Sequence, residues 1–122
     1  MLILYIATGA FIVGGGLIGI ELAEMLHSRN KKVSLIVREE NYWATVLPPD
    51  EAKMVNEQIR RNHIHLYLQT ELEEIIGDEE GNVISIRTNK GEILPCQFVG
   101  LTTGVHPNIQ WLGSESPLEV TL

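Results

Sequence analysis

Hydrophobic and polar positions in the first third of the chain follow two different periods. An apolar run ends at Val13, and a second one, KVSLIV, occupies residues 32–37. Short uninterrupted runs of this kind are typical of strands that are buried on both faces. Between them, from Leu17 to His27, apolar residues recur at helical spacing, and the polar and basic segment HSRNKK then suits the end of a helix. The pattern predicts a strand-helix-strand (βαβ) unit.

The rest of the chain predicts a second helix and a group of short strands. The segment PDEAKMVNEQIRRN (49–62) is amphipathic and predicts a helix that starts at Asp50 after two prolines, with Ala52, Val55 and Ile59 in its apolar stripe. HIHLYLQ (63–69) predicts a third strand, and QFVGLTTG (97–104) predicts a final strand. Between them, three short segments predict an antiparallel meander: TELEEIIGD (70–78), GNVISIRT (81–88) and GEILPCQ (91–97). We therefore expect an α/β fold. More specifically, we expect a three-layer Rossmann-like domain with a small parallel sheet, a helix on each side of part of it, and an antiparallel β-meander over one face.

A glycine-rich turn joins the first predicted strand to the first predicted helix. The glycines Gly14, Gly16 and Gly19 have the spacing Gly-x-Gly-x-x-Gly, and a strand before and a helix after make this spacing informative. The first glycine allows the tight turn, the second lets the backbone approach a pyrophosphate, and the third lets helix and strand pack closely. Free amides at the start of the helix would bind the anion. The alternative is a turn that only joins strand to helix.

The residues after the second predicted strand give conflicting indications about the cofactor. In dinucleotide-binding folds this position holds an acidic residue that accepts hydrogen bonds from the adenosine ribose, but here it is Arg38, followed by Glu39. A guanidinium favours a ribose 2′-phosphate, whereas a carboxylate favours the bare diol and repels the phosphate. Alternatively, both side chains belong to a solvated turn. We expect NAD or NADP, with a slight preference for NADPH.

Length and charge restrict the kinds of partner. The chain has 122 residues, enough for one domain, and a formal net charge of −7, which disfavours nucleic acids and anionic membranes. The first 20 residues carry no charge and reach the length of a membrane span. Their glycines and the lack of a basic flank favour the strand and turn instead. We expect neither nucleic acid nor membrane as a partner.

Cysteine and histidine usage predicts no metal site. The single cysteine, Cys96, excludes an internal disulfide, and we expect it to be a small buried residue in a protein of a reducing compartment, the cytoplasm. The four histidines lack metal-ligand spacing with acidic or thiol partners, and the two of HIH are expected on one side of a strand. We predict no metal site and no catalytic residue within the chain.

The combination of these motifs resembles one family, the FAD-dependent pyridine nucleotide-disulfide oxidoreductases. The similarity extends from Phe11 to about Trp111 and depends on FIVGGGLIGIELAEML, KVSLIVREENYW, the meander and LTTGVHPN. It implies that the chain is the NAD(P)-binding domain, which donates hydride to a flavin. The cofactor contacts that the resemblance implies are the backbone at Gly14, Gly15, Gly16 and Gly19 on the pyrophosphate, Ile18 and Glu21 near the nicotinamide ribose and carboxamide, Arg38 and Glu39 at the adenosine ribose, and Thr103 and Gly104 over the nicotinamide half.

The resemblance also predicts how the chain is divided. Residues 1–10 would be a strand left from an FAD domain, residues 11–112 the NAD(P)-binding domain, and residues 113–122 a tail. FAD would belong to the full-length protein, so the chain alone is expected not to catalyse turnover. We expect the N-terminal strand to pair with its own domain or with a second copy, as a homodimer. The alternatives are a free-standing nucleotide-binding or sensing module and a fragment of an S-adenosylmethionine-binding methyltransferase.

Overall fold

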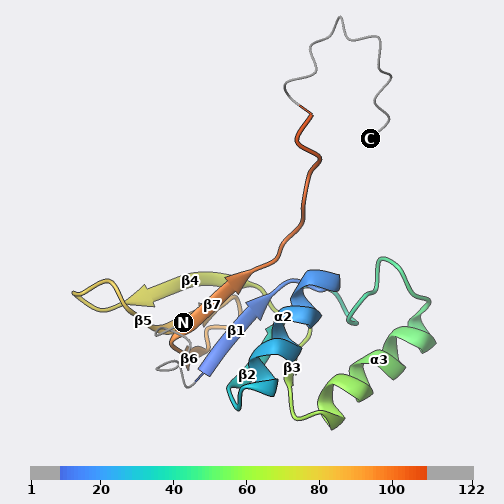
Figure 1. Ribbon diagram of the computed structural model, residues 1–122, viewed down its shortest axis with the longest axis horizontal. Helices are drawn as coiled ribbons and strands as arrows, with labels where there is room; N and C mark the ends of the chain where they lie inside the picture. Colours follow the sequence, from blue (N-terminus) through green and yellow to red (C-terminus); the bar gives the residue numbers. More distant parts are fainter. Residues whose placement is uncertain (1–8, 110–122) are drawn as a thin grey trace, which may run out of the picture.

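A computed structural model of the chain describes residues 9–109, in which two sheets and two helices form three layers (Figure 1). The central sheet has four parallel strands in the order β3-β2-β1-β7. Its strands and the helices between them are β1 (Gly9–Val13), α2 (Leu17–Ser28), β2 (Lys32–Ile36), α3 (Pro49–Arg61), β3 (His65–Tyr67) and β7 (Phe98–Leu101). The predicted βαβ unit, second helix and final strand are confirmed.

Both helices cover the same face of the central sheet. Ala10 and Ile12 of β1 lie in one buried cluster with Ala23 of α2 and Ile59 of α3. The expectation of a helix on each side of the sheet is wrong. The strand order shows that the chain moves in one direction from β1 to β2 to β3, and right-handed crossovers in one direction place their helices on one face.

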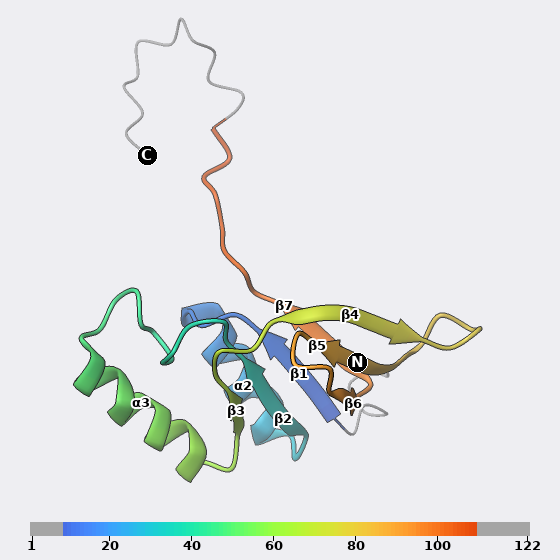
Figure 2. The same ribbon diagram turned by 180° about the vertical axis from the view of Figure 1, so that it is seen from behind.

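The other face of the central sheet is covered by a three-stranded antiparallel sheet (Figure 2). Its strands are β4 (Leu72–Gly77), β5 (Val83–Thr88) and β6 (Ile93–Pro95). Phe11 and Ile36 of the central sheet belong to a second buried cluster with Ile86 of β5 and Cys96, which is fully buried. The predicted meander and the predicted buried cysteine are confirmed. The antiparallel sheet, the central sheet and the helices are the three layers.

The first strand begins earlier than predicted. β1 starts at Gly9, which pairs with Lys32 of β2, two positions before the expected domain boundary at residue 11. Of the expected N-terminal strand, residues 1–10, only Gly9 and Ala10 are described, and both belong to β1; the expected tail, residues 113–122, lies outside the described residues.

The third strand is shorter than HIHLYLQ (63–69) predicts. β3 begins at His65, and His63 lies in the preceding turn with a φ of +62°. The prediction that both imidazoles occupy one side of a strand is wrong, because the chain adopts a left-handed conformation at His63 to turn from α3 into β3.

Within residues 9–109, no group of three or more His, Cys, Asp or Glu side chains could hold a metal ion.

Candidate functional site

The glycine turn lies at the carboxyl end of β1, between β2 and β7. Gly14 has a φ of +134°, a conformation that L side chains rarely adopt, and a Cβ at this position would lie 2.3 Å from the carbonyl oxygen of Thr102. Thr102 clamps the turn from the β7 side. Its N–H and its hydroxyl both donate to the carbonyl oxygen of Val13, at 2.8 Å and 2.9 Å. Glycine is therefore required at position 14 for two reasons, the backbone conformation and the close approach of β7.

Gly19 is required by the packing of α2 against the strands. A Cβ at this position would lie 3.0 Å from the carbonyl oxygen of Gly14, 3.0 Å from Thr102 Oγ1 and 3.2 Å from the hydroxyl oxygen of Tyr42. The helix can approach this closely only with glycine here. Ala23, one turn further along α2, is fully buried in the cluster under both helices. These contacts agree with the close helix-strand packing that the spacing predicts.

Gly16 differs from the other two glycines because no contact within the described residues requires it. It is the N-cap residue of α2, with φ −112° and ψ −173°, an extended conformation open to other residues. A Cβ at this position would meet no atom of residues 9–109 within 4 Å. No described side chain caps the helix, and its first turn contains no acidic residue. The space in front of Gly16 is therefore open and faces the backbone donors at the start of α2.

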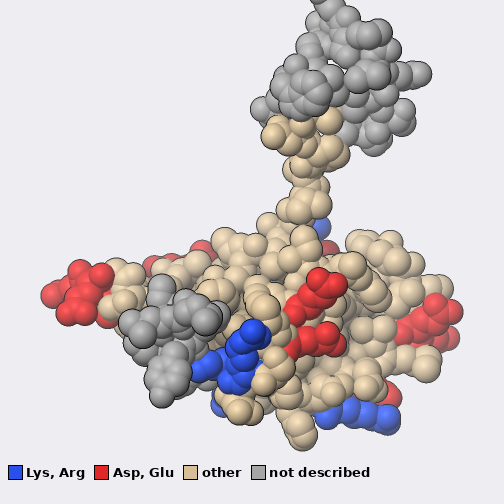
Figure 3. Space-filling model, in the orientation of Figure 1, with Lys and Arg blue, Asp and Glu red and all other residues tan. Residues whose placement is uncertain are grey.

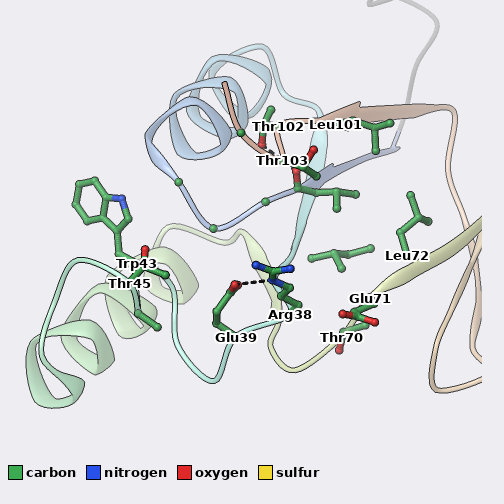
Figure 4. A pocket seen from close by; sticks show the side chains of 17 residues that line it. Arg38, Glu39, Trp43, Thr45, Thr70, Glu71, Leu72, Leu101, Thr102 and Thr103 are labelled. Carbon is green, nitrogen blue, oxygen red and sulfur yellow. Dashed lines mark hydrogen bonds and ion pairs between the residues drawn. The ribbon is translucent and has the colours of Figure 1, made fainter. Parts of the chain in front are cut away.

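A cavity of about 510 Å³ lies at this edge of the central sheet (Figure 4). Seven of the ten predicted cofactor residues line it: Gly14, Gly15 and Gly16 from the turn, Arg38 and Glu39 after β2, and Thr103 and Gly104 after β7. The other three are not among its lining residues. Ile18 is 54% exposed, Glu21 is exposed, and Gly19 is buried behind the turn. The structure thus brings together three segments that are far apart in the sequence.

The cavity also includes residues that the sequence patterns did not single out. Trp43, Ala44 and Thr45 come from the loop after β2, and residues 70–72 come from the start of the meander (Figure 4). Thr102 also lines the cavity. Its position could have been predicted from the sequence, because ligands of open α/β sheets bind beyond the carboxyl ends of the strands and Thr102 directly follows β7. The position of residues 70–72 could not have been predicted, because only the passage of the chain from the central sheet to the meander places them there.

Arg38 and Glu39 form an ion pair at the β2 end of the cavity. Arg38 Nε lies 2.8 Å from Glu39 Oε1 (Figure 4). The hydrogen bond and the negative charge of Glu39, with a smaller effect of Glu71, raise the pKa of Arg38. The two neighbours that indicate opposite cofactors therefore partly neutralise each other, and the carboxylate of Glu71 lies on the same cavity.

The surface carries the acidic excess of the sequence. Figure 3 shows acidic side chains gathered at the turn between β4 and β5, where the sequence is Asp78-Glu79-Glu80, and separate, smaller groups of Lys and Arg side chains elsewhere on this face. In the part of the chain that the structure describes, neither helix has the length and apolar character needed to cross a membrane.

Comparisons with known proteins agree with this architecture. The family model for pyridine nucleotide-disulphide oxidoreductases matches residues 6–121. The chain is 34% identical over 106 residues to the NAD(P)H coenzyme A polysulfide/persulfide reductase of Pyrococcus horikoshii, which covers 87% of this chain and 23% of that protein. It is 30% identical over 99 residues to the NADH oxidase of Methanocaldococcus jannaschii, over 81% of this chain and 21% of the oxidase.

The fold is shared with solved structures as well. The NAD-dependent persulfide reductase from A. fulgidus matches with a TM-score of 0.80 at 24% sequence identity, over 88% of this chain and 20% of that chain. The chain spans less than a quarter of the length of the two curated relatives. A family match over nearly the whole chain, with the glycine turn and the two packed sheets in place, shows that the chain belongs to the pyridine nucleotide-disulphide oxidoreductase family.

Proposed function

We propose that the chain binds NADH or NADPH as the hydride-donor domain of an FAD-dependent oxidoreductase. The main observation in support of this proposal is the environment of Gly16. Gly14 and Gly19 are explained by the contacts of the protein itself, whereas the space that a Cβ at Gly16 would enter is open among the described residues. A ligand whose phosphates approach the backbone at this point supplies the missing reason for a glycine.

A pyrophosphate fits the space in front of the glycine turn. Backbone N–H groups at the start of α2 lack side-chain partners in the described residues, and the positive end of the helix dipole favours an anion there. The clamp of Thr102 on Val13 and the close packing at Gly19 hold the turn in one shape before a ligand arrives. The residues present therefore fit a dinucleotide without rearrangement of the turn.

The two ends of the cavity suit the two halves of the cofactor. Arg38 and Glu39 offer a donor and an acceptor to the adenosine ribose, and Thr103 and Gly104 lie at the end of β7, where the nicotinamide half would extend. Bound reduced nicotinamide would supply a hydride to the flavin of the full-length protein. Ile18 and the exposed Glu21 lie on the accessible side of α2, where we propose that the FAD domain covers the nicotinamide.

The proposal is tested by titrating ¹⁵N-labelled protein with ADP, NADH and NADPH and following the backbone amides by nuclear magnetic resonance. We expect the amides of Gly14, Gly16 and Gly19 to shift together, because all three belong to the turn that would hold the pyrophosphate. Gly81 and Gly91, which lie in the turns of the meander away from the cavity, serve as internal controls. If ADP and NADH leave the amides of the turn unmoved at millimolar concentrations, the proposed site is wrong.

A further inference from the structure

Tyr42 contacts the glycine turn from outside the cavity. It lies in the loop between β2 and α3, is only 1% exposed, and packs in the cluster under the two helices. Its hydroxyl donates a 2.5 Å hydrogen bond to the carbonyl oxygen of Gly16. Tyr42 is not among the residues that line the cavity. Any effect of this side chain on a ligand must therefore pass through the turn.

A buried polar network holds the backbone of Tyr42 in place. The N–H of Tyr42 donates to Asn56 Oδ1 of α3 at 2.8 Å, and Asn56 Nδ2 donates to Asn41 Oδ1 at 2.9 Å. Asn56 and Asn41 are 4% and 8% exposed. Within residues 9–109 no buried side-chain nitrogen or oxygen lacks a partner, and buried networks that are fully paired rigidify the structure around them. The loop is thus fixed against α3, and the phenol ring is fixed with it.

The hydrogen bond to Gly16 determines where the next amide points. In a trans peptide group the C=O and the following N–H point in opposite directions. The Gly16 oxygen accepts from the Tyr42 hydroxyl and, at 3.3 Å, from the N–H of Ile20. The N–H of Leu17 therefore points out of the helix, toward the open space in front of the turn. A group that holds the carbonyl also holds this donor.

The Tyr42 hydroxyl keeps its proton throughout the neutral range. Burial raises the pKa of Tyr42 to about 12, against a smaller lowering effect of the Ile20 backbone. The side chain is therefore a hydrogen-bond donor at every pH at which a dinucleotide would bind.

We propose that Tyr42 is a positioning residue for the pyrophosphate: its hydroxyl holds the Gly16–Leu17 peptide group so that the Leu17 amide faces the ligand. The inference rests on the proposed function. It extends the binding machinery to a residue that touches no ligand, and through Asn56 it connects the shape of the turn to α3.

The test compares Tyr42→Phe with the wild-type protein, and uses Tyr67→Phe as the matched control. Tyr67 also loses only a phenol hydroxyl, but its ring packs against Phe11 in the cluster under the meander, on the other face of the sheet. Dissociation constants for ADP and for adenosine are measured by amide shift titration. Adenosine lacks phosphate, so it reports on the adenosine end of the cavity alone.

We expect Tyr42→Phe to weaken ADP roughly three- to tenfold, the range of one net hydrogen bond, and to leave adenosine unchanged. The ratio of the two constants is independent of the folded fraction, because partial unfolding weakens both ligands by the same factor. Tyr67→Phe should keep the wild-type ratio. If the wild type binds ADP but the ratio is unchanged in Tyr42→Phe, the positioning role of Tyr42 is wrong, whereas the proposed function is not affected. A wild-type protein that does not bind ADP would overturn the proposed function itself.

Discussion

Replacing each of two glycines of the turn by alanine should separate the needs of the fold from the needs of the ligand. At Gly14 the new Cβ would lie 2.3 Å from the Thr102 carbonyl oxygen and 2.7 Å from Thr102 Oγ1, at a φ of +134°. Forced overpacking and an unfavourable φ each cost about 1–3 kcal/mol, so we expect Gly14→Ala to lose roughly 3–5 kcal/mol of unfolding free energy. That loss is a large part of the roughly 5–15 kcal/mol that holds a domain of this kind folded.

Gly16→Ala should leave the unfolding free energy almost unchanged but weaken ADP binding. The position is extended, at φ −112°, and its Cβ would meet no described atom within 4 Å. Alanine lowers the conformational entropy of the unfolded chain, which stabilises the folded protein, but alanine is a poorer N-cap residue than glycine, which destabilises it. Because these effects oppose each other, the change in unfolding free energy should stay within about 0.5 kcal/mol of zero. The Cβ would occupy the space proposed for a phosphate, so ADP should bind at least about tenfold more weakly, which corresponds to about 1.4 kcal/mol.

Urea unfolding followed by circular dichroism and ADP titration measure the two effects on the same variants. Gly91→Ala is the control for backbone conformation, because Gly91 has a φ of +78° but open space around its Cβ position. It should lose about 1 kcal/mol of unfolding free energy and keep ADP affinity. If Gly16→Ala binds ADP as tightly as the wild type, no ligand approaches the backbone at Gly16. If Gly14→Ala is no less stable than Gly91→Ala, the close contact with Thr102 does not exist.

Two further predictions concern the ionisable groups around the site. Glu39→Gln removes the carboxylate that pairs with Arg38 at 2.8 Å, so the affinity for NADPH should rise relative to that for NADH, whereas Arg38→Glu should shift the ratio toward NADH. Fluorescence titration with both cofactors measures the ratio, and an unchanged ratio in both variants would place the pair in a solvated turn. The second prediction follows from the pKa of Tyr42, which is raised from 10.0 to about 12. The folded protein then holds this proton more tightly than the unfolded chain, so the stabilisation present below pH 10 should be lost between about pH 10 and 12, by at most about 2 kcal/mol after solvent screening. Urea unfolding across this range should show a steeper decline in the wild type than in Tyr42→Phe, and identical profiles would contradict a buried, protonated Tyr42.

The amino-acid sequence alone was enough to predict the elements and the glycine turn. The two helices and the meander follow from apolar spacing and from turn residues, which act between neighbours in the chain. The turn was predictable for the same reason, since an interrupted Gly-x-Gly-x-x-Gly pattern between a strand and a helix has few other uses. The burial of Cys96 was also expected from its residue type, because a free cysteine is usually a small buried residue.

Only the tertiary structure decided how these elements meet. The helices share one face because the strand order β3-β2-β1 directs both crossovers the same way, and no periodicity within a helix records that order. The Tyr42 hydroxyl meets Gly16 across 26 positions of sequence, and Thr102 meets Val13 across 89. Such contacts depend on the packing of whole elements against each other, and a local pattern of residue types carries no information about that packing.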